Sequence, residues 1–202
     1  MKMNNPYLET IINYKHKLTY LANRTKEDTI LTINKYSSVY QVDPEIIYSF
    51  ILIESMNRGG IFTRKLEKFC SFFPYLLVKL DPSLGLGQVK ISTAKMVWNS
   101  SCDTEIIKKL LNPQNNIELV SNLLSIYLKD CKGENNKFMS LVKLYTTGNK
   151  FTPINRELII YYNLLCWSIS NHTYKKTTIK YSKINNLGTL RPVPRCVKSP
   201  AD

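Results

Sequence analysis

The fold of this chain is limited first of all by a predicted helix that has a clear start, a clear end and a strongly apolar middle. Asp43 suits the N-cap position, Pro44 suits the first helical position, and the glycine pair at 59–60 suits a helix end. Residues 46–53 read Ile-Ile-Tyr-Ser-Phe-Ile-Leu-Ile, which leaves only a tyrosine and a serine as polar interruptions. We therefore predict a helix over about residues 44–57 with a face that belongs in a core.

One carboxylate follows this apolar run. Its burial there costs free energy, which points to a functional role. On a helix, Glu54 shares a face with Phe50 and Ile51 and, one turn further back, with Ile47. Burial and the negative end of the helix dipole both raise the pKa of such a carboxyl group. A carboxylic acid that keeps its proton near neutral pH can donate it to a leaving oxygen, as glycoside cleavage requires. Glu54 is therefore a candidate general acid.

A surface ion pair is the alternative interpretation of the same residue. Glu54 would then point to the mouth of the helical bundle and pair with Arg58, four residues on. On helix chemistry alone this is the commoner outcome, because most Glu–Arg pairs at this spacing lie on surfaces. The choice between the two depends on what the rest of the chain places around Glu54.

Apolar residues recur at helical spacing through most of the remaining chain, which predicts a mainly α-helical protein. Further helices are predicted over residues 8–22, 26–40, 90–99, 103–111 and 154–169. Another is predicted from Asn112-Pro113 to about residue 130, and one more begins at Phe138 and is ended by Gly148. Residues 61–82 are apolar and aromatic but are broken by Pro74, so short helices and an irregular segment are both compatible with the sequence there.

The predicted elements divide the chain into three parts. Residues 1–40 are expected to form N-terminal helices that pack on the core, and residues 41–170 a compact helical domain. After residue 170 the composition changes, because threonine and lysine dominate and no long apolar period survives. Residues 171–202 are therefore predicted to be a basic tail that is loosely packed or disordered. A partial alternation of apolar residues over 174–184 is also compatible with one strand.

The formal net charge of +13 indicates an anionic partner or a well-solvated surface. A nucleic acid, an anionic membrane surface or an anionic cell wall would suit it. The lysines are spread rather than blocked, however, which favours a solvated surface for most of them, and no nucleic-acid-binding motif is present. No stretch approaches 18 uninterrupted apolar residues, so no transmembrane segment is predicted. No apolar signal region is visible at the N-terminus, so no secretory signal is predicted.

The distribution of cysteine and histidine argues against a metal centre. The 5 cysteines lie far apart without any C-x-x-C pair, and only 2 histidines are present. We predict no metal and no cofactor. Reduced thiols are the expected state, with one disulfide left open as the alternative.

A glycine-rich segment over residues 83–89, Ser-Leu-Gly-Leu-Gly-Gln-Val, is the second candidate site feature. Gly85 and Gly87 allow the backbone to approach a ligand closely or to adopt positive φ. Gln88 offers both a donor and an acceptor to a sugar amide or hydroxyl. The glycine spacing is wrong for a phosphate-binding loop. A plain turn before a helix is the alternative.

These features occur in an order that resembles the catalytic domain of the lytic transglycosylases, which are related to goose-type lysozymes. The resemblance covers about residues 40–165. It is carried by Glu54-Ser55, Ser83 to Val89, Thr93-Ala94, Asn112-Pro113 with Asn116-Ile117, Tyr127-Leu128, Tyr145-Thr146-Thr147-Gly148 and Tyr161-Tyr162. It implies a compact lysozyme-like domain over residues 41–170, with the N-terminal helices and the basic tail as additions.

The resemblance implies cleavage of the MurNAc–GlcNAc bond of peptidoglycan, with Glu54 as the single general acid and base. Glu54 would protonate the glycosidic oxygen and then take the proton of the muramoyl 6-hydroxyl, so that a 1,6-anhydro ring closes. Attack by water would instead give hydrolysis. The implied substrate-binding residues, by similarity, are Ser55, Ser83, Gly85, Gln88, Tyr145, Tyr161 and Tyr162, with Tyr161 or Tyr162 positioning Glu54.

Departures from the family pattern bear on these expectations. The stretch between Glu54 and Ser83 is unusually long. Thr146 replaces the usual asparagine of a Tyr-Asn-x-Gly element, and Gly87 replaces the usual methionine. Asp81 is either a second carboxylate, which would favour an inverting hydrolysis, or the turn residue of an Asp-Pro pair.

Two other classes of function stay open at this point. One is a non-catalytic lysozyme-like module that binds cell wall or a partner protein, and the other is a nucleic-acid binder that uses the basic tail. For the leading interpretation the expected partner is the peptidoglycan glycan strand. A phage, secretion or conjugation machine is the expected route to the bacterial cell wall.

Overall fold

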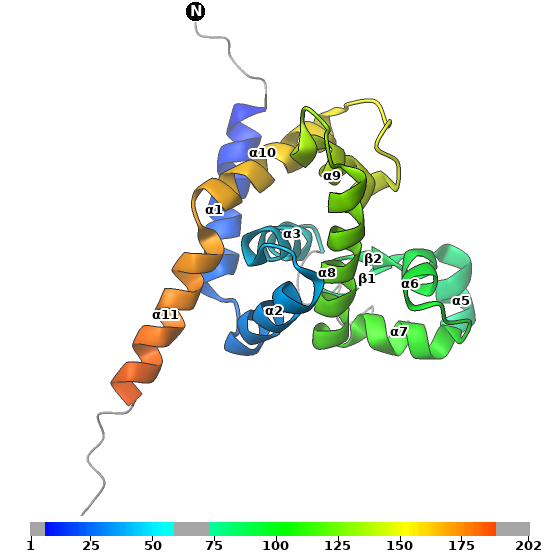
Figure 1. Ribbon diagram of the computed structural model, residues 1–202, viewed down its shortest axis with the longest axis horizontal. Helices are drawn as coiled ribbons and strands as arrows, with labels where there is room; N and C mark the ends of the chain where they lie inside the picture. Colours follow the sequence, from blue (N-terminus) through cyan, green and yellow to red (C-terminus); the bar gives the residue numbers. More distant parts are fainter. Residues whose placement is uncertain (1–6, 59–72, 189–202) are drawn as a thin grey trace, which may run out of the picture.

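The computed structural model describes residues 7–58 and 73–188, and within them the protein is mainly helical (Figure 1). The described elements are α1 (Leu8–Asn23), α2 (Glu27–Tyr40), α3 (Pro44–Asn57), α5 (Pro74–Leu80), β1 (Ser83–Leu84), β2 (Val89–Lys90), α6 (Ile91–Trp98), α7 (Asp103–Leu111), α8 (Pro113–Asp130), α9 (Lys137–Thr147), α10 (Arg156–Ser170) and α11 (Thr173–Gly188). Across these described residues, no helix is both long enough and apolar enough to cross a membrane.

Helix α3 lies in the middle of the fold, as its apolar sequence requires. Every residue from Ile46 to Glu54 is buried. Helices α1, α2, α8, α10 and α11 all pack against it and surround it in Figure 1. The Asp43 carboxylate accepts a hydrogen bond from the Glu45 amide at 2.8 Å, which confirms the predicted N-cap. The observed helix spans the predicted residues 44–57.

The other predicted helices are confirmed to within about two residues at their ends, and three of them begin at a local side-chain cap. Asn112, Asn136 and Asn155 each accept a hydrogen bond from a backbone amide in the first turn of the helix that follows. Gly148 ends α9 in the left-handed conformation, with φ of 72°. Within the apolar segment 61–82, residues 74–80 form α5, and the part up to residue 72 lies outside the described residues.

A smaller group of elements, α5, α6, α7 and the β1–β2 hairpin, lies to one side of the main bundle (Figure 1). The hairpin is antiparallel, with Ser83 opposite Lys90 and Leu84 opposite Val89. The Asp81 carboxylate accepts hydrogen bonds from the backbone amide and the hydroxyl of Ser92, at 2.8 and 2.7 Å. Asp81 therefore ties the segment before β1 to the first turn of α6.

Residues 173–188 form the helix α11, so the prediction of a loose tail or a strand is wrong for this part of the chain. Thr173, Tyr174 and Thr177 recur at helical spacing and are buried against the bundle. Threonine and tyrosine favour strands on propensity alone, but packing against α1, α3 and α10 overrides that preference. Residues 189–202 of the predicted tail lie outside the described residues.

Distant polar side chains hold α11 in place. The two carboxylate oxygens of Glu45, in the first turn of α3, accept hydrogen bonds from the amides of Tyr174 and Lys175, each at 3.0 Å. The Tyr48 hydroxyl bonds to the Thr25 hydroxyl at 2.8 Å and to the Thr177 hydroxyl at 3.3 Å. Glu45 thus caps α11 from another helix, where a negative charge is favourable.

Candidate active site

The side chain of Glu54 is buried at the C-terminal end of α3. Only 9% of the residue is exposed, and the residues that share its face, Ile47, Phe50 and Ile51, are buried with it. The Tyr161 hydroxyl on α10 donates a hydrogen bond to Glu54 Oε1 at 2.8 Å. The predicted core-facing position of Glu54 is therefore confirmed, and one of its carboxyl oxygens has a fixed partner.

Burial raises the pKa of Glu54 from 4.5 to about 7. Hydrogen bonds from Tyr161 and Asn57 lower it, since they stabilise the charged form, but they offset only part of the desolvation. The alternative of a surface pair with Arg58 conflicts with the burial of Glu54. The Arg58 amide donates to the Glu54 carbonyl at 2.8 Å as an ordinary helical bond.

Aromatic rings from three helices pack next to this carboxyl group. The Phe50 ring lies between Tyr145 and Tyr161, with ring centroids 4.6 and 5.7 Å away. Burial raises the pKa of both tyrosines well above 10, and the charge of Glu54 raises it further. Both tyrosines therefore stay neutral near pH 7 and can act as hydrogen-bond donors.

The glycine-rich loop reaches this group of rings through Tyr145. The Tyr145 hydroxyl donates to the Gly87 carbonyl at 2.7 Å. Gly85 adopts φ of 79°, which glycine tolerates at low cost, and Gln88 adopts φ of 47°. The Gln88 side-chain nitrogen donates to the Gly85 carbonyl at 2.8 Å. Part of the hydrogen-bonding capacity predicted for a sugar is thus used to close the loop itself.

Asn116 on α8 holds the same loop from beneath. It is fully buried, its Oδ1 accepts from the Gly87 amide at 2.7 Å, and its Nδ2 donates to the carbonyls of Leu84 and Leu110 at 3.2 and 3.0 Å. In the sequence, Asn116 stands out only as part of the Asn-Pro-x-x-Asn-Ile motif, and no individual role is predicted for it. An amide side chain next to the apolar residues of α8 is the signal that could have indicated a buried polar contact.

The absence of a side chain at residue 87 is required by packing. A Cβ atom there would lie 2.2 Å from Val120 Cγ2 and 3.0 Å from the Tyr145 hydroxyl. Glycine at this position therefore lets the loop sit directly on α8 and α9.

The other predicted site residues occupy less specific positions. Ser55 follows Glu54 on α3 and is partly exposed, and Ser83 lies in β1, paired with Lys90. Tyr162 is partly exposed and bonds to Cys166, which raises its pKa, and to Asn136, which lowers it. Of the two adjacent tyrosines, the structure thus brings Tyr161 to Glu54.

Two of the departures from the family pattern also receive a structural account. The Asp81 carboxylate binds Ser92 through both oxygens, which matches a structural role at a turn. Thr146 is exposed, and its hydroxyl donates to the Val142 carbonyl at 2.7 Å within its own helix. Asp81 is therefore engaged at the start of α6 and is no longer a good candidate for a second catalytic carboxylate.

Comparisons with protein-family models, curated proteins and solved structures found no match to this chain. The functional argument therefore rests on the geometry of the site. That geometry combines a carboxyl group that titrates near neutral pH, a tyrosine that fixes one of its oxygens, and a rigid backbone loop attached to the neighbouring tyrosine. Such an arrangement can deliver a proton and take one back.

Proposed function

We propose that the protein is a peptidoglycan lytic transglycosylase of lysozyme-like fold, with Glu54 as its single general acid and base. The observation that carries the proposal is the buried Glu54 carboxyl with a pKa of about 7, held by Tyr161. A carboxylic acid in this environment is populated in both protonation states near neutral pH, which a group that serves first as acid and then as base requires.

The proposed reaction uses Glu54 twice. The protonated carboxyl donates its proton to the oxygen that links MurNAc to GlcNAc, and the bond from that oxygen to the MurNAc anomeric carbon breaks. The resulting carboxylate then takes the proton of the MurNAc 6-hydroxyl, whose oxygen forms the new bond to the anomeric carbon. Because the nucleophile belongs to the substrate, neither a second carboxylate nor a cofactor is needed. The hydrogen bond from Tyr161 to Oε1 holds the carboxyl group in place for both steps.

The remaining predicted residues have supporting roles in this proposal. In the proposed complex, Tyr145, Gln88 and the loop at Gly85 would contact the sugar rings, and Ser55 and Ser83 would contact substrate hydroxyls. The net charge of +13 supports binding to an anionic wall. The substrate is the glycan strand of peptidoglycan, and a phage, secretion or conjugation machine would deliver the protein to it.

Release of soluble fragments from purified peptidoglycan tests the proposal. The Glu54→Gln variant is expected to lose at least about a hundredfold in rate, since it can neither donate nor accept the proton. Glu105→Gln is the matched control, because Glu105 is an exposed residue paired with Lys109 on α7. Equal rates for Glu54→Gln and the wild type would rule out the assignment.

Mass spectrometry of the fragments then separates the two routes. Anhydro products lack the water that hydrolysis adds, so they are lighter by one water. Reducing products would show that water is the nucleophile. Binding to the wall without any turnover, in the wild type and in Glu54→Gln alike, would show a non-catalytic binding module.

A further inference from the structure

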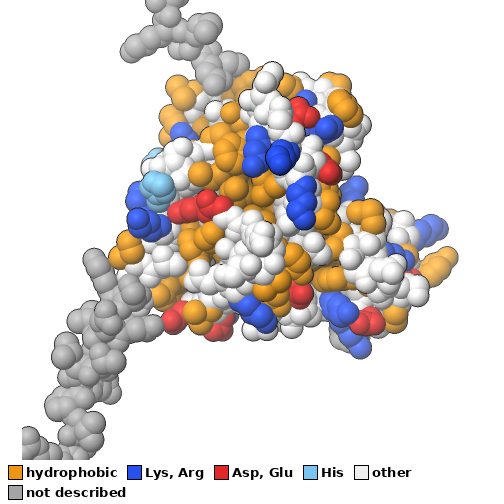
Figure 2. All heavy atoms as spheres, viewed as in Figure 1, with side chains coloured by type: hydrophobic (Ala, Val, Ile, Leu, Met, Phe, Trp, Pro, Cys, Tyr) orange, Lys and Arg blue, Asp and Glu red, His pale blue; other side chains and the backbone are white. Residues whose placement is uncertain are grey.

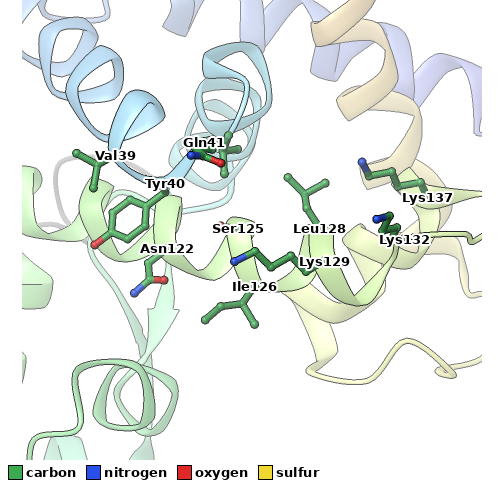
Figure 3. Close-up of a pocket in the computed structure, with 11 residues that line it drawn as sticks. Val39, Tyr40, Gln41, Asn122, Ser125, Ile126, Leu128, Lys129, Lys132 and Lys137 are labelled. Atoms are coloured by element: carbon green, nitrogen blue, oxygen red, sulfur yellow. The ribbon is translucent and has the colours of Figure 1, made fainter.

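A groove of about 610 Å³ opens between the C-terminal end of α2, the turn into α3 and the second half of α8 (Figure 3). Apolar, polar and basic side chains line it. Neither this groove nor the smaller one of about 280 Å³ beside α1 and α11 is lined by Glu54. Ten residues of rise along α3 separate Pro44, next to the groove, from Glu54, which corresponds to roughly 15 Å.

The groove has three kinds of surface. Val39, Val42, Ile126 and Leu128 provide apolar contact, and Val39 and Ile126 are 60% and 40% exposed. The amide groups of Gln41 and Asn122 and the hydroxyl of Ser125 provide donors and acceptors. Lys129, Lys132 and Lys137 supply positive charge. In Figure 3, Lys132 and Lys137 lie at one end of the view, whereas the Lys129 ammonium group points toward the middle, near Ser125 and Ile126.

The lysines of the groove are available for a ligand. Within the described part of the chain, the ion pairs use Lys95, Lys109 and Lys150, and none involves Lys129, Lys132 or Lys137. Glu134, in the same loop as Lys132, is already paired with Lys150 at 3.1 Å. On this face of the molecule, Figure 2 shows hydrophobic side chains bordered by Lys or Arg side chains.

We propose that this groove binds the acidic stem peptides of peptidoglycan, an inference that rests on the proposed function. A short acidic peptide matches all three surfaces: its amides suit Gln41, Asn122 and Ser125, its methyl groups suit the apolar contacts, and its carboxylates suit the lysines. A phosphate polymer would use only the lysines. The groove is a second site on the same substrate, built partly by α8, whose Asn116 also holds the loop at Gly87.

Titration calorimetry with free stem peptides tests this inference. The probe is the peptide fraction that an amidase releases from purified peptidoglycan, added to the full-length protein. We expect binding by the wild type and at least tenfold weaker binding by Lys132→Glu/Lys137→Glu. The control Lys108→Glu/Lys175→Glu changes the net charge equally at two exposed lysines outside the groove, and we expect wild-type affinity for it. Circular dichroism verifies that both variants are folded.

Three outcomes would overturn the inference. The first is that the wild type does not bind the peptide, and the second is that both double variants lose peptide affinity equally. The third is that inorganic phosphate at the same concentration fully displaces the peptide. An Ile126→Ser variant adds a readout that charge alone does not move, since it is expected to weaken peptide binding severalfold. Cleavage of peptidoglycan without peptide binding would refute the groove alone, whereas peptide binding without any cleavage would refute the proposed function alone.

Discussion

At the scale of single residues, the protonation of Glu54 is decided by burial. Its place at the end of α3 removes the carboxyl group from water, which disfavours the charged form. The hydrogen bonds from Tyr161 and Asn57 offset only part of this desolvation free energy. Folding therefore keeps this carboxyl group protonated at pH values at which a glutamate in solution is ionised.

The first prediction concerns stability against pH. The pKa of Glu54 is about 7 in the folded protein and close to 4.5 when the chain is unfolded. The contribution of Glu54 to stability is therefore fully present below pH 4.5 and is lost as pH rises through about 7. We expect the loss to be about 3 kcal/mol across this window, and Glu54→Gln to abolish it.

Urea unfolding of the wild type and of Glu54→Gln between pH 4 and 8 measures this difference. The difference in unfolding free energy between the two proteins isolates Glu54 from every other titrating group. A difference that stays constant across the window would mean that Glu54 is exposed in the folded protein.

The second prediction concerns the tyrosine that binds Glu54. Tyr161→Phe keeps the buried ring but removes the hydrogen bond that stabilises the carboxylate, so the pKa of Glu54 should rise above 7. Because the proposed reaction begins from the protonated acid, the alkaline limb of the pH–rate profile should move up by about one pH unit. Tyr162→Phe is the control, since Tyr162 bonds to Cys166 and Asn136 instead. Similar shifts in both variants would contradict the assignment of Tyr161.

At the scale of elements, α11 depends on a contact that is distant in sequence. Its first turn is capped by Glu45, which lies about 130 residues earlier, at the start of α3. Two backbone amides would lose their partner without that carboxylate, and the favourable charge at the helix N-terminus would be lost with them. Because the helix propensity of its own sequence is weak, α11 is expected to depend on this single cap for its stability on the bundle.

The third prediction is that Glu45→Ala loosens α11. We expect a loss of about 1–2 kcal/mol in unfolding free energy and faster amide hydrogen exchange over residues 173–181 than over α8. Glu105→Ala, which removes an exposed carboxylate from α7, should leave exchange in α11 unchanged. Unchanged exchange in Glu45→Ala would show that the packing of Tyr174 and Thr177 suffices without the cap.

At the scale of the whole molecule, the net charge of +13 shapes encounters with anionic polymers. The described ion pairs are few and involve partly exposed side chains, so they neutralise little of the surface. The net charge therefore attracts anionic polymers across several ångströms of solvent, and dissolved salt weakens this attraction.

The fourth prediction is a steep salt dependence of wall binding. Between about 0.05 and 0.5 M NaCl, the fraction of protein that sediments with purified peptidoglycan should fall severalfold, since the screening length shortens over this range. Chitin, an uncharged polymer, is the control and should show a much smaller change. A salt-independent fraction bound to peptidoglycan would mean that the net charge does not contribute.

Much of the architecture could be predicted from the sequence because it depends on neighbours along the chain. The start of α3 follows from Asp43 and Pro44, and the end of α9 follows from Gly148. The buried position of Glu54 follows from its spacing to Phe50 and Ile51 on one helical face. These features need only local capping and the helical period.

The amino-acid sequence is therefore enough to place the helices and to single out the carboxylate that ends the most apolar of them. Three outcomes required the folded chain: Tyr161 rather than Tyr162 holds Glu54, Asn116 carries the loop at Gly87, and the threonine-rich segment after residue 172 is a helix. Each of these outcomes depends on hydrogen bonds and packing between residues far apart in sequence. No local period or propensity encodes such partners, and the partners reverse the local preference where the two conflict.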